Sequence, residues 1–129
     1  MKIIRFYETD NHDSRFEEID IPFPESKTDA GYTYCMSRPF DAGAILAELP
    51  VGLNQDWHVA PNRQFVVVLT GRLEVETSDG EKRRWGPGEM FMADDTGGQG
   101  HRTRVLEGPA KLLFMRVPLS FDPRASMAG

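Results

Sequence analysis

The sequence predicts a single all-β domain, folded as a closed double-sheet barrel around a central pocket. Short segments in which apolar and polar residues alternate recur along the chain, and a period of two is typical of strands with one buried face. Glycine and proline clusters separate these segments at short spacing, which indicates a sandwich or barrel. Helical periodicity is nearly absent. A chain of 129 residues has room for one domain with one core.

Strands are expected from the N-terminus to the end of the barrel. The first covers residues 3–8, and residues 16–23 form an edge strand or extended arm that ends at Pro22 and Pro24. Further strands are expected over residues 32–37, 44–49, 64–77, 82–85, 90–93, 101–106 and 111–117. Residues 41–49 are the one plausible helix, but Gly43 and the short length argue against it.

These strands divide the chain into three parts. Residues 1–31 hold the N-terminal strands and an arm, and residues 32–117 form the barrel. Residues 118–129 form a short tail of small and polar residues, which is expected to fray.

The composition excludes several classes of function. A formal net charge of −5 disfavours binding to nucleic acid or to an anionic membrane. Residues 1–6 lack the apolar core of a signal peptide, and the longest aliphatic and aromatic run, residues 65–69, is too short to span a bilayer. Cys35 is the only cysteine, which favours a reduced, cytoplasmic location. Its apolar and aromatic neighbours predict a buried structural thiol.

Two motifs lie between residues 58 and 101. The run His58-Val59-Ala60-Pro61-Asn62-Arg63-Gln64 is followed by six residues and then Gly71, and Gly86-Pro87-Gly88 precedes His101. These motifs resemble those of the cupin family, which has His-x-His, three or four residues, Glu or Gln, six residues and Gly, and later a Pro-x-Gly element before a histidine. The run from Asp95 to His101 is also similar to small bacterial single-domain cupins. The resemblance implies a double-stranded β-helix, the jelly-roll barrel of the cupins.

The same resemblance implies a reduced metal site. Cupins that bind a metal use three histidines and one carboxylate or amide inside the barrel. Here His58, Gln64 and His101 occupy three of these positions, while Ala60 replaces the second histidine. The site would hold a divalent ion such as iron, manganese, nickel or zinc, with a neutral amide as a weaker ligand than a carboxylate. An alternative register pairs Asp56 with His58 as Asp-x-His.

The alternation of strand residues also predicts which side chains line the pocket. Gln64, Val66 and Val68 share one face, and His101 shares an inward face with Thr103. We therefore expect Val66, Val68 and Thr103 to contact a ligand. A purely structural interpretation stays open, in which the histidines are hydrogen-bonded core residues and Gln64 caps backbone groups.

The residues before His101 allow two interpretations. Asp94 and Asp95 are a turn-initiating acidic pair, or carboxylates near the barrel mouth that act as an acid or base. The glycines over residues 97–100 lack the Lys-Ser/Thr ending and the following helix of a phosphate loop. They are expected to let the backbone pass close to the barrel mouth.

Three functions fit these observations. The first is a cupin-type protein that binds a small molecule in the barrel lumen. The second is a metal-dependent oxygenase or isomerase, in which Ala60 vacates a coordination position. The third is a structural or oligomeric role. Metal binding is expected to be weak and to fall as the histidines protonate below about pH 6.5.

A homodimer is expected as well. Residues 3–23 hold two apolar stretches beyond a minimal barrel, and exposed strand edges need cover. Most soluble oligomers are twofold symmetric. A partner copy of the same chain would therefore cover these stretches.

Overall fold

The computed structural model describes residues 1–128, and these residues form strands and loops but no helix. None of this part of the chain forms the long apolar helix that a membrane crossing requires. Nine strands follow one another along the chain: β1 (Lys2–Glu8), β2 (Ser14–Asp20), β3 (Glu25–Asp29), β4 (Tyr32–Met36), β5 (Gly43–Leu49), β6 (Gln64–Thr77), β7 (Lys82–Trp85), β8 (Met90–Asp94) and β9 (His101–Arg116).

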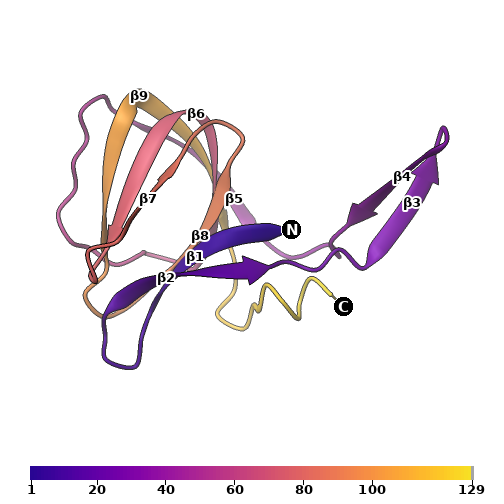
Figure 1. The fold of residues 1–129 in the computed structure, drawn as a ribbon, viewed down its shortest axis with the longest axis horizontal. Coiled ribbons are helices and arrows are strands. Elements are labelled where there is room, and N and C mark those ends of the chain that lie inside the picture. The colour runs from indigo at the N-terminus through magenta and orange to yellow at the C-terminus, as the bar shows by residue number, and fades with distance from the viewer. Residues whose placement is uncertain (129) are drawn as a thin grey trace.

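Seven of the strands build the barrel (Figure 1). Their order is β2-β1-β8-β6-β9-β5, with β7 paired to β6. The long strands β6 and β9 belong to both walls: one half of their ladder lies between β8 and β5, and the other half lies beside β7. This arrangement confirms the predicted all-β, jelly-roll fold. Within residues 1–128 the end strands β2 and β5 share no ladder, so backbone hydrogen bonds do not close the barrel.

A glycine turns the corner between the two walls. The β6–β9 register shifts between Val68 and Leu73, on either side of Gly71. Gly71 has a φ of 85°, and a Cβ atom there would lie 2.8 Å from the Cα of Ala110. Only glycine allows this conformation together with so close a crossing of the strands. Gly71 therefore marks a bend in one continuous strand.

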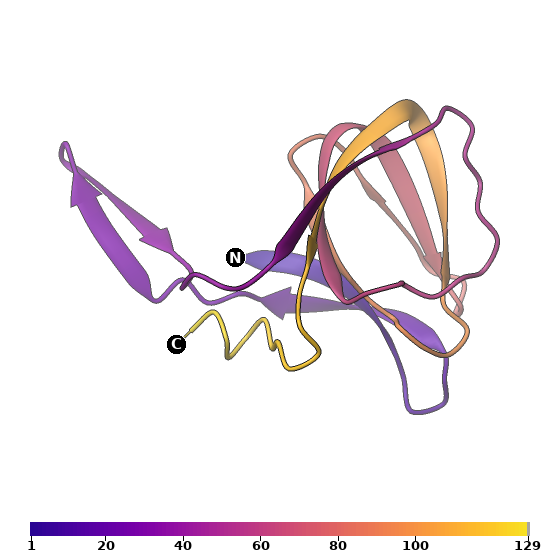
Figure 2. The same cartoon turned by 180° about the vertical axis from the view of Figure 1, so that it is seen from behind.

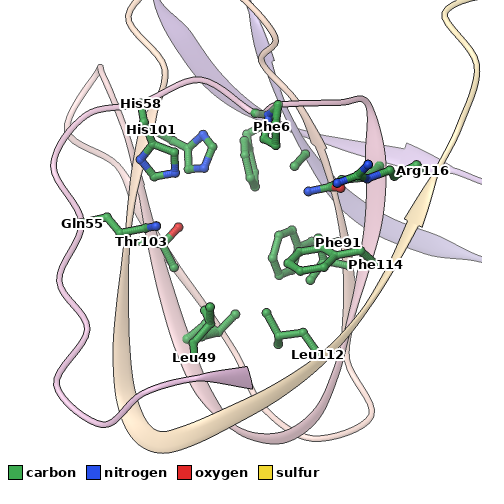
Figure 3. A pocket seen from close by; sticks show the side chains of 16 residues that line it. Phe6, Leu49, Gln55, His58, Phe91, His101, Thr103, Leu112, Phe114 and Arg116 are labelled. Carbon is green, nitrogen blue, oxygen red and sulfur yellow. The ribbon is translucent and has the colours of Figure 1, made fainter. Parts of the chain in front are cut away.

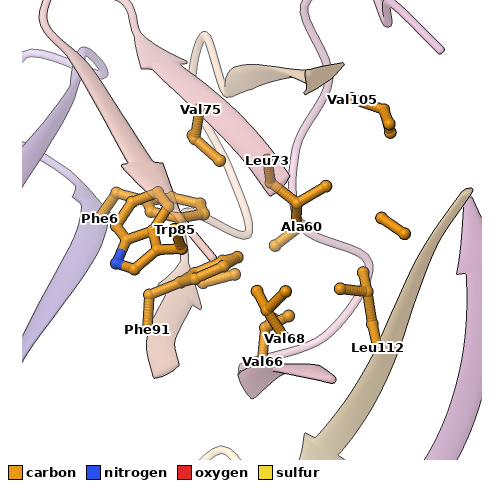
Figure 4. Close-up of a cluster of buried hydrophobic side chains, with 12 residues drawn as sticks. Phe6, Ala60, Val66, Val68, Leu73, Val75, Trp85, Phe91, Val105 and Leu112 are labelled. Carbon is orange, nitrogen blue, oxygen red and sulfur yellow. The ribbon is translucent and has the colours of Figure 1, made fainter. Parts of the chain in front are cut away.

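The two faces of the sheet carry separate apolar clusters. The cluster inside the barrel includes aromatic side chains from β1, β7 and β8 and aliphatic side chains from β6 and β9 (Figure 4); its buried members are Phe6, Ala60, Val66, Val68, Leu73, Val75, Trp85, Phe91, Ala93, Val105, Ala110 and Leu112. The second cluster uses alternate residues of the same strands together with the C-terminal tail: Ile3, Ile19, Ile21, Phe65, Met92, Val117, Phe121 and Met127.

The tail is therefore part of the fold, and the expectation that it frays is wrong. Phe121 and Met127 are buried, and the Phe121 ring centroid lies 5.8 Å from that of Phe65. Arg63 fastens the tail by donating hydrogen bonds to the carbonyls of Leu119 and Phe121. Two buried apolar residues are enough to dock the tail against the barrel. The other tail residues are mostly small or polar, so the composition of the segment resembles that of a loop. The tail also covers part of the apolar surface that suggested a dimer.

Strands β3 and β4 form a hairpin that projects from the barrel (Figures 1 and 2). The two strands pair only with each other in a two-stranded sheet, so β4 is not the barrel strand that its apolar pattern predicted. Cys35 is exposed on this hairpin, and the predicted burial of its thiol is wrong. Tyr32 is 78% exposed. An aromatic strand pattern indicates a sheet, but it does not say whether another layer covers that sheet.

Candidate functional site

A cavity of about 290 Å³ lies inside the barrel (Figure 3). Most of its wall is apolar, with Phe6, Leu49, Ala60, Pro61, Val66, Leu73, Phe91, Ala93, Leu112 and Phe114. Its polar lining residues are Gln55, His58, Gln64, His101, Thr103 and Arg116. An apolar cavity with a few polar groups is the usual form of a small-molecule site, and this one lies at the small end of the size range.

His58 and His101 lie side by side on one wall of the cavity (Figure 3). His101 opens β9, and His58 belongs to the loop between β5 and β6. The two residues exchange backbone hydrogen bonds, with N···O distances of 2.9 and 2.8 Å. Their ring centroids are 4.5 Å apart, and the Phe6 ring lies 4.7 Å from His101. The backbone bridge thus fixes both imidazoles relative to each other.

One nitrogen of each imidazole is engaged outside the cavity. The Nδ1 atom of His58 lies 2.8 Å from the carbonyl oxygen of Asp56, which can only accept, so this Nδ1 carries the proton. The Nδ1 atom of His101 lies 2.5 Å from Oδ2 of Asp95. Within residues 1–128 no protein hydrogen bond reaches either Nε2 atom. Both Nε2 atoms are therefore available to a ligand.

Asp95 supports His101 from behind the cavity wall. Its side chain is fully buried, and burial raises the pKa of the Asp95 carboxyl, while the hydrogen bond and charge of His101 oppose this shift. Its Oδ1 atom has no hydrogen-bond partner in the described part of the chain. The sequence allowed Asp95 a role as an acid or base at the barrel mouth. The structure places it as a buried partner of the His101 ring.

The two motif histidines thus meet inside a jelly-roll barrel, as the resemblance implied. The chain has a cupin-type fold. In this barrel the backbones of the first-motif and second-motif histidines are joined by a pair of hydrogen bonds. Ala60, at the position of the missing histidine, lies in the cavity wall.

Comparison with known proteins gives structural neighbours alone. No protein-family model and no curated protein matches the sequence. The structure is similar to SPY1581 of Streptococcus pyogenes, a conserved protein of unknown function (24% identity, TM-score 0.47, 67% of this chain and 72% of that one). It is also similar to the Cnp3 cupin domain of Schizosaccharomyces pombe (13% identity, TM-score 0.47, 81% of this chain and 73% of that one). A third neighbour is KdgF from Halomonas sp. (26% identity, TM-score 0.44, 65% of this chain and 76% of that one).

Most side chains that the sequence assigned to the pocket do line the cavity. His58, Gln64 and His101 from the expected metal set are there, as are Val66 and Thr103 from the expected ligand contacts. Val68 is fully buried in the core and is not a lining residue. The reason is its position beside the register shift of β6, where the strand turns away toward Gly71.

Other lining residues were missed by sequence reasoning. Arg116 follows Leu112 and Phe114 at a spacing of two, and all three line the cavity, so strand alternation contained the signal. Phe6 and Gln55 carried no such signal. Phe6 lies on β1, and the local sequence does not reveal that β1 pairs in parallel with β8. Gln55 lies in the loop between β5 and β6, where strand alternation does not apply.

The donors that suit a divalent metal ion are two imidazoles and one amide. Side chains held through Nδ1 with Nε2 open have the orientation typical of metal-ligating histidines. Gln64 faces the same cavity, but in residues 1–128 no group of three or more His, Cys, Asp or Glu side chains is arranged to hold an ion. Asp56 does not line the cavity, and its carboxylate accepts from the Trp57 N–H. The Asp-x-His register therefore adds no carboxylate to the cavity.

Proposed function

We propose that this cupin-type protein binds a small molecule in the barrel cavity, with His58 and His101 as the polar recognition pair. The observation that carries the proposal is the pair of open Nε2 atoms beside an otherwise apolar cavity. Polar groups inside proteins almost always have hydrogen-bond partners. A ligand that carries a hydroxyl or amide group would satisfy these imidazoles and fill the apolar remainder.

Gln64 supports the same proposal from the other motif position. The residue is only 7% exposed, and its side chain lines the cavity. The Gln64 backbone is hydrogen-bonded in the ladders with both β8 and β9, so the position of its Cα atom is fixed. A rigid scaffold whose polar groups lack protein partners beside an apolar cavity is preorganised for a ligand.

Filling the cavity is expected to weaken ligand binding strongly. With 4-hydroxyphenylacetamide as a neutral probe, Ala60→Leu should weaken binding at least tenfold, because the added atoms occupy ligand space beside His58. Ala44→Leu makes the same chemical change on the exposed edge strand β5 and should bind like the wild type. Ligand-observed NMR titration measures both, and circular dichroism checks folding. Equal binding by Ala60→Leu and the wild type would contradict the proposal.

A metal-dependent enzyme is the second candidate, favoured by the Nδ1 bonds that orient both imidazoles. His58 and His101 would hold the ion, and a bound divalent metal would supply Lewis-acid or oxygen chemistry. Ala60→His is expected to tighten Zn²⁺ binding about tenfold or more at pH 7.5, because it adds a donor to the same wall. Calorimetry compares it with the wild type, with His58→Ala and with Ala44→His as a surface control. Equal Zn²⁺ affinities of Ala60→His and the wild type would count against a metal site.

We also propose that the protein is a homodimer assembled through the β3–β4 hairpin. A lone two-stranded sheet is marginally stable in water, and Tyr32 and Tyr34 expose large rings on this one. Light scattering at micromolar concentration should give twice the chain mass. The double variant Tyr32→Glu, Tyr34→Glu should give the monomer mass, whereas Leu119→Glu, at another exposed apolar residue, should not. A monomeric wild type would refute the proposal.

A reducing, cytoplasmic location fits this dimer. Cys35 is exposed on the hairpin and is the only cysteine of the chain. In an oxidising compartment an exposed thiol at an interface would form disulfides between chains. The location is therefore proposed together with the dimer.

A further inference from the structure

We propose that the ligand is a small carboxylic acid with an apolar body and that Arg116 binds its carboxylate. This rests on the proposed function, because it specifies the chemistry of the molecule in the same cavity. The starting observation is the charge of the lining residues. Arg116 is the single formally charged side chain among the sixteen that line the cavity, and none of the sixteen is Asp or Glu.

The lining has the opposite charge to the rest of the protein. The chain has 20 acidic and 15 basic residues and a net charge of −5, yet the cavity presents one guanidinium and two imidazoles. Apolar side chains make up most of the cavity wall, and charge interactions beside apolar groups are stronger than those between fully hydrated groups. A cavity of this composition favours an anion over a neutral molecule or a cation.

The Arg116 guanidinium is free to bind that anion. In residues 1–128 it has no carboxylate within ion-pair distance, whereas Arg5 and Arg63 are both paired with Asp94. Asp41 lies with Arg116 along a shallow hollow on the exterior, without forming an ion pair. Figure 3 shows Arg116 on the side of the cavity opposite His58 and His101.

Gln64 completes the corner around Arg116. The two residues are direct partners in the β6–β9 ladder, and both side chains line the cavity. The guanidinium offers two parallel N–H donors, which match the two oxygens of a carboxylate, and the Gln64 amide offers another donor. Arg116 is exposed, so the carboxylate would stay partly hydrated and avoid the cost of burying a charge.

The apolar residues between the two polar ends specify the body of the ligand. The rings of Phe91 and Phe114 lie beneath Arg116 in Figure 3, and the histidines lie on the far side. An acid bound at Arg116 would therefore place a flat or aliphatic body against these rings. A hydroxyl at its other end would reach toward the Nε2 atoms of His58 and His101.

Paired acids and amides of one shape test this proposal. The probes are 4-hydroxyphenylacetate with 4-hydroxyphenylacetamide, and hexanoate with hexanamide, titrated by ligand-observed NMR at pH 7.5. The wild type is expected to bind each acid at least tenfold more tightly than its amide. Arg116→Gln should reduce this preference to less than twofold, and Arg116→Lys should keep part of it. Arg102→Gln removes an exposed arginine that is paired with Glu76 on the exterior and should leave the preference unchanged.

The outcomes separate this inference from the proposed function. Amides that bind as tightly as the acids, with binding lost in Ala60→Leu, would overturn the carboxylate inference and leave the small-molecule site standing. An acid preference that survives Arg116→Gln would remove Arg116 as the anchor. If neither acids nor amides bind the folded wild type, both proposals fail.

Discussion

Replacing Gly100 by alanine is expected to lower the free energy of unfolding by about 3–4 kcal/mol and to abolish ligand binding. Gly100 has a φ of 75°, and its Cβ atom would lie 2.1 Å from the carbonyl oxygen of His58. The left-handed conformation costs a side-chain-bearing residue roughly 1–2 kcal/mol. The clash also pushes His58 away from His101, and each of the two backbone hydrogen bonds is worth about 1 kcal/mol.

Gly80→Ala is the matched control. Gly80 has a φ of 87°, and no atom lies within 4 Å of a Cβ built there, so only the conformational cost of about 1–2 kcal/mol applies. Denaturant unfolding of both variants isolates the effect of the contact with His58. A loss in Gly100→Ala no larger than that in Gly80→Ala would show that the close approach does not stabilise the site.

Replacing Asp94 by alanine is expected to cost about 3–5 kcal/mol, because it strands two partly buried guanidinium groups. The Asp94 side chain is 5% exposed and accepts hydrogen bonds from Arg5 at 2.8 Å and from Arg63 at 2.6 Å. Burial alone would lower the pKa of Arg5, but the hydrogen bonds and charges of Asp94 and Glu17 outweigh it and raise that pKa. Arg63 also holds the tail at Phe121, so the variant should loosen the tail.

An exposed ion pair provides the comparison. Glu81→Ala removes the partner of Arg83, where both side chains are more than 40% exposed, and should change stability by about 0.5 kcal/mol or less. Hydrogen exchange of the amides around Phe121 should rise in Asp94→Ala and stay unchanged in Glu81→Ala. A loss below about 1 kcal/mol in Asp94→Ala would contradict the role of Asp94 as the link between β1, β8 and the tail.

Local sequence pattern was sufficient for most of the barrel and insufficient for its surroundings. Alternation and turn residues locate β5 to β8 within a few residues. The two strands expected over residues 101–106 and 111–117 are one continuous strand, β9, because Gly108 and Pro109 do not end the strand. The same pattern misplaced β4, since the aromatic residues around Cys35 belong to a hairpin without a covering layer. Strand β3 is polar throughout and carries no such signal. The tail docks through Phe121 and Met127, a long-range contact that composition does not reveal.

The cavity could be predicted only in part for a similar reason. Motif spacing located His58 and His101, and alternation placed Gln64 and Val66 on the inward face. The same alternation extended too far at Val68, because a register shift ends the regular strand there. The contact between Asp95 and His101 depends on how the short loop between them folds, which strand alternation does not describe. The parallel pairing of β1 with β8 joins strands far apart in the sequence, so local pattern does not reveal it.

A crystal structure with 4-hydroxyphenylacetate tests the small-molecule site most directly. The molecule is expected in the barrel cavity, with its ring against Phe91 and Phe114, its hydroxyl within hydrogen-bond distance of Nε2 of His58 or His101, and its carboxylate at Arg116. Density in the same cavity with the carboxylate turned away from Arg116 would contradict the carboxylate inference alone. A cavity without the probe at saturating concentration, or with its space taken by rearranged side chains, would contradict the proposal that this barrel binds small molecules.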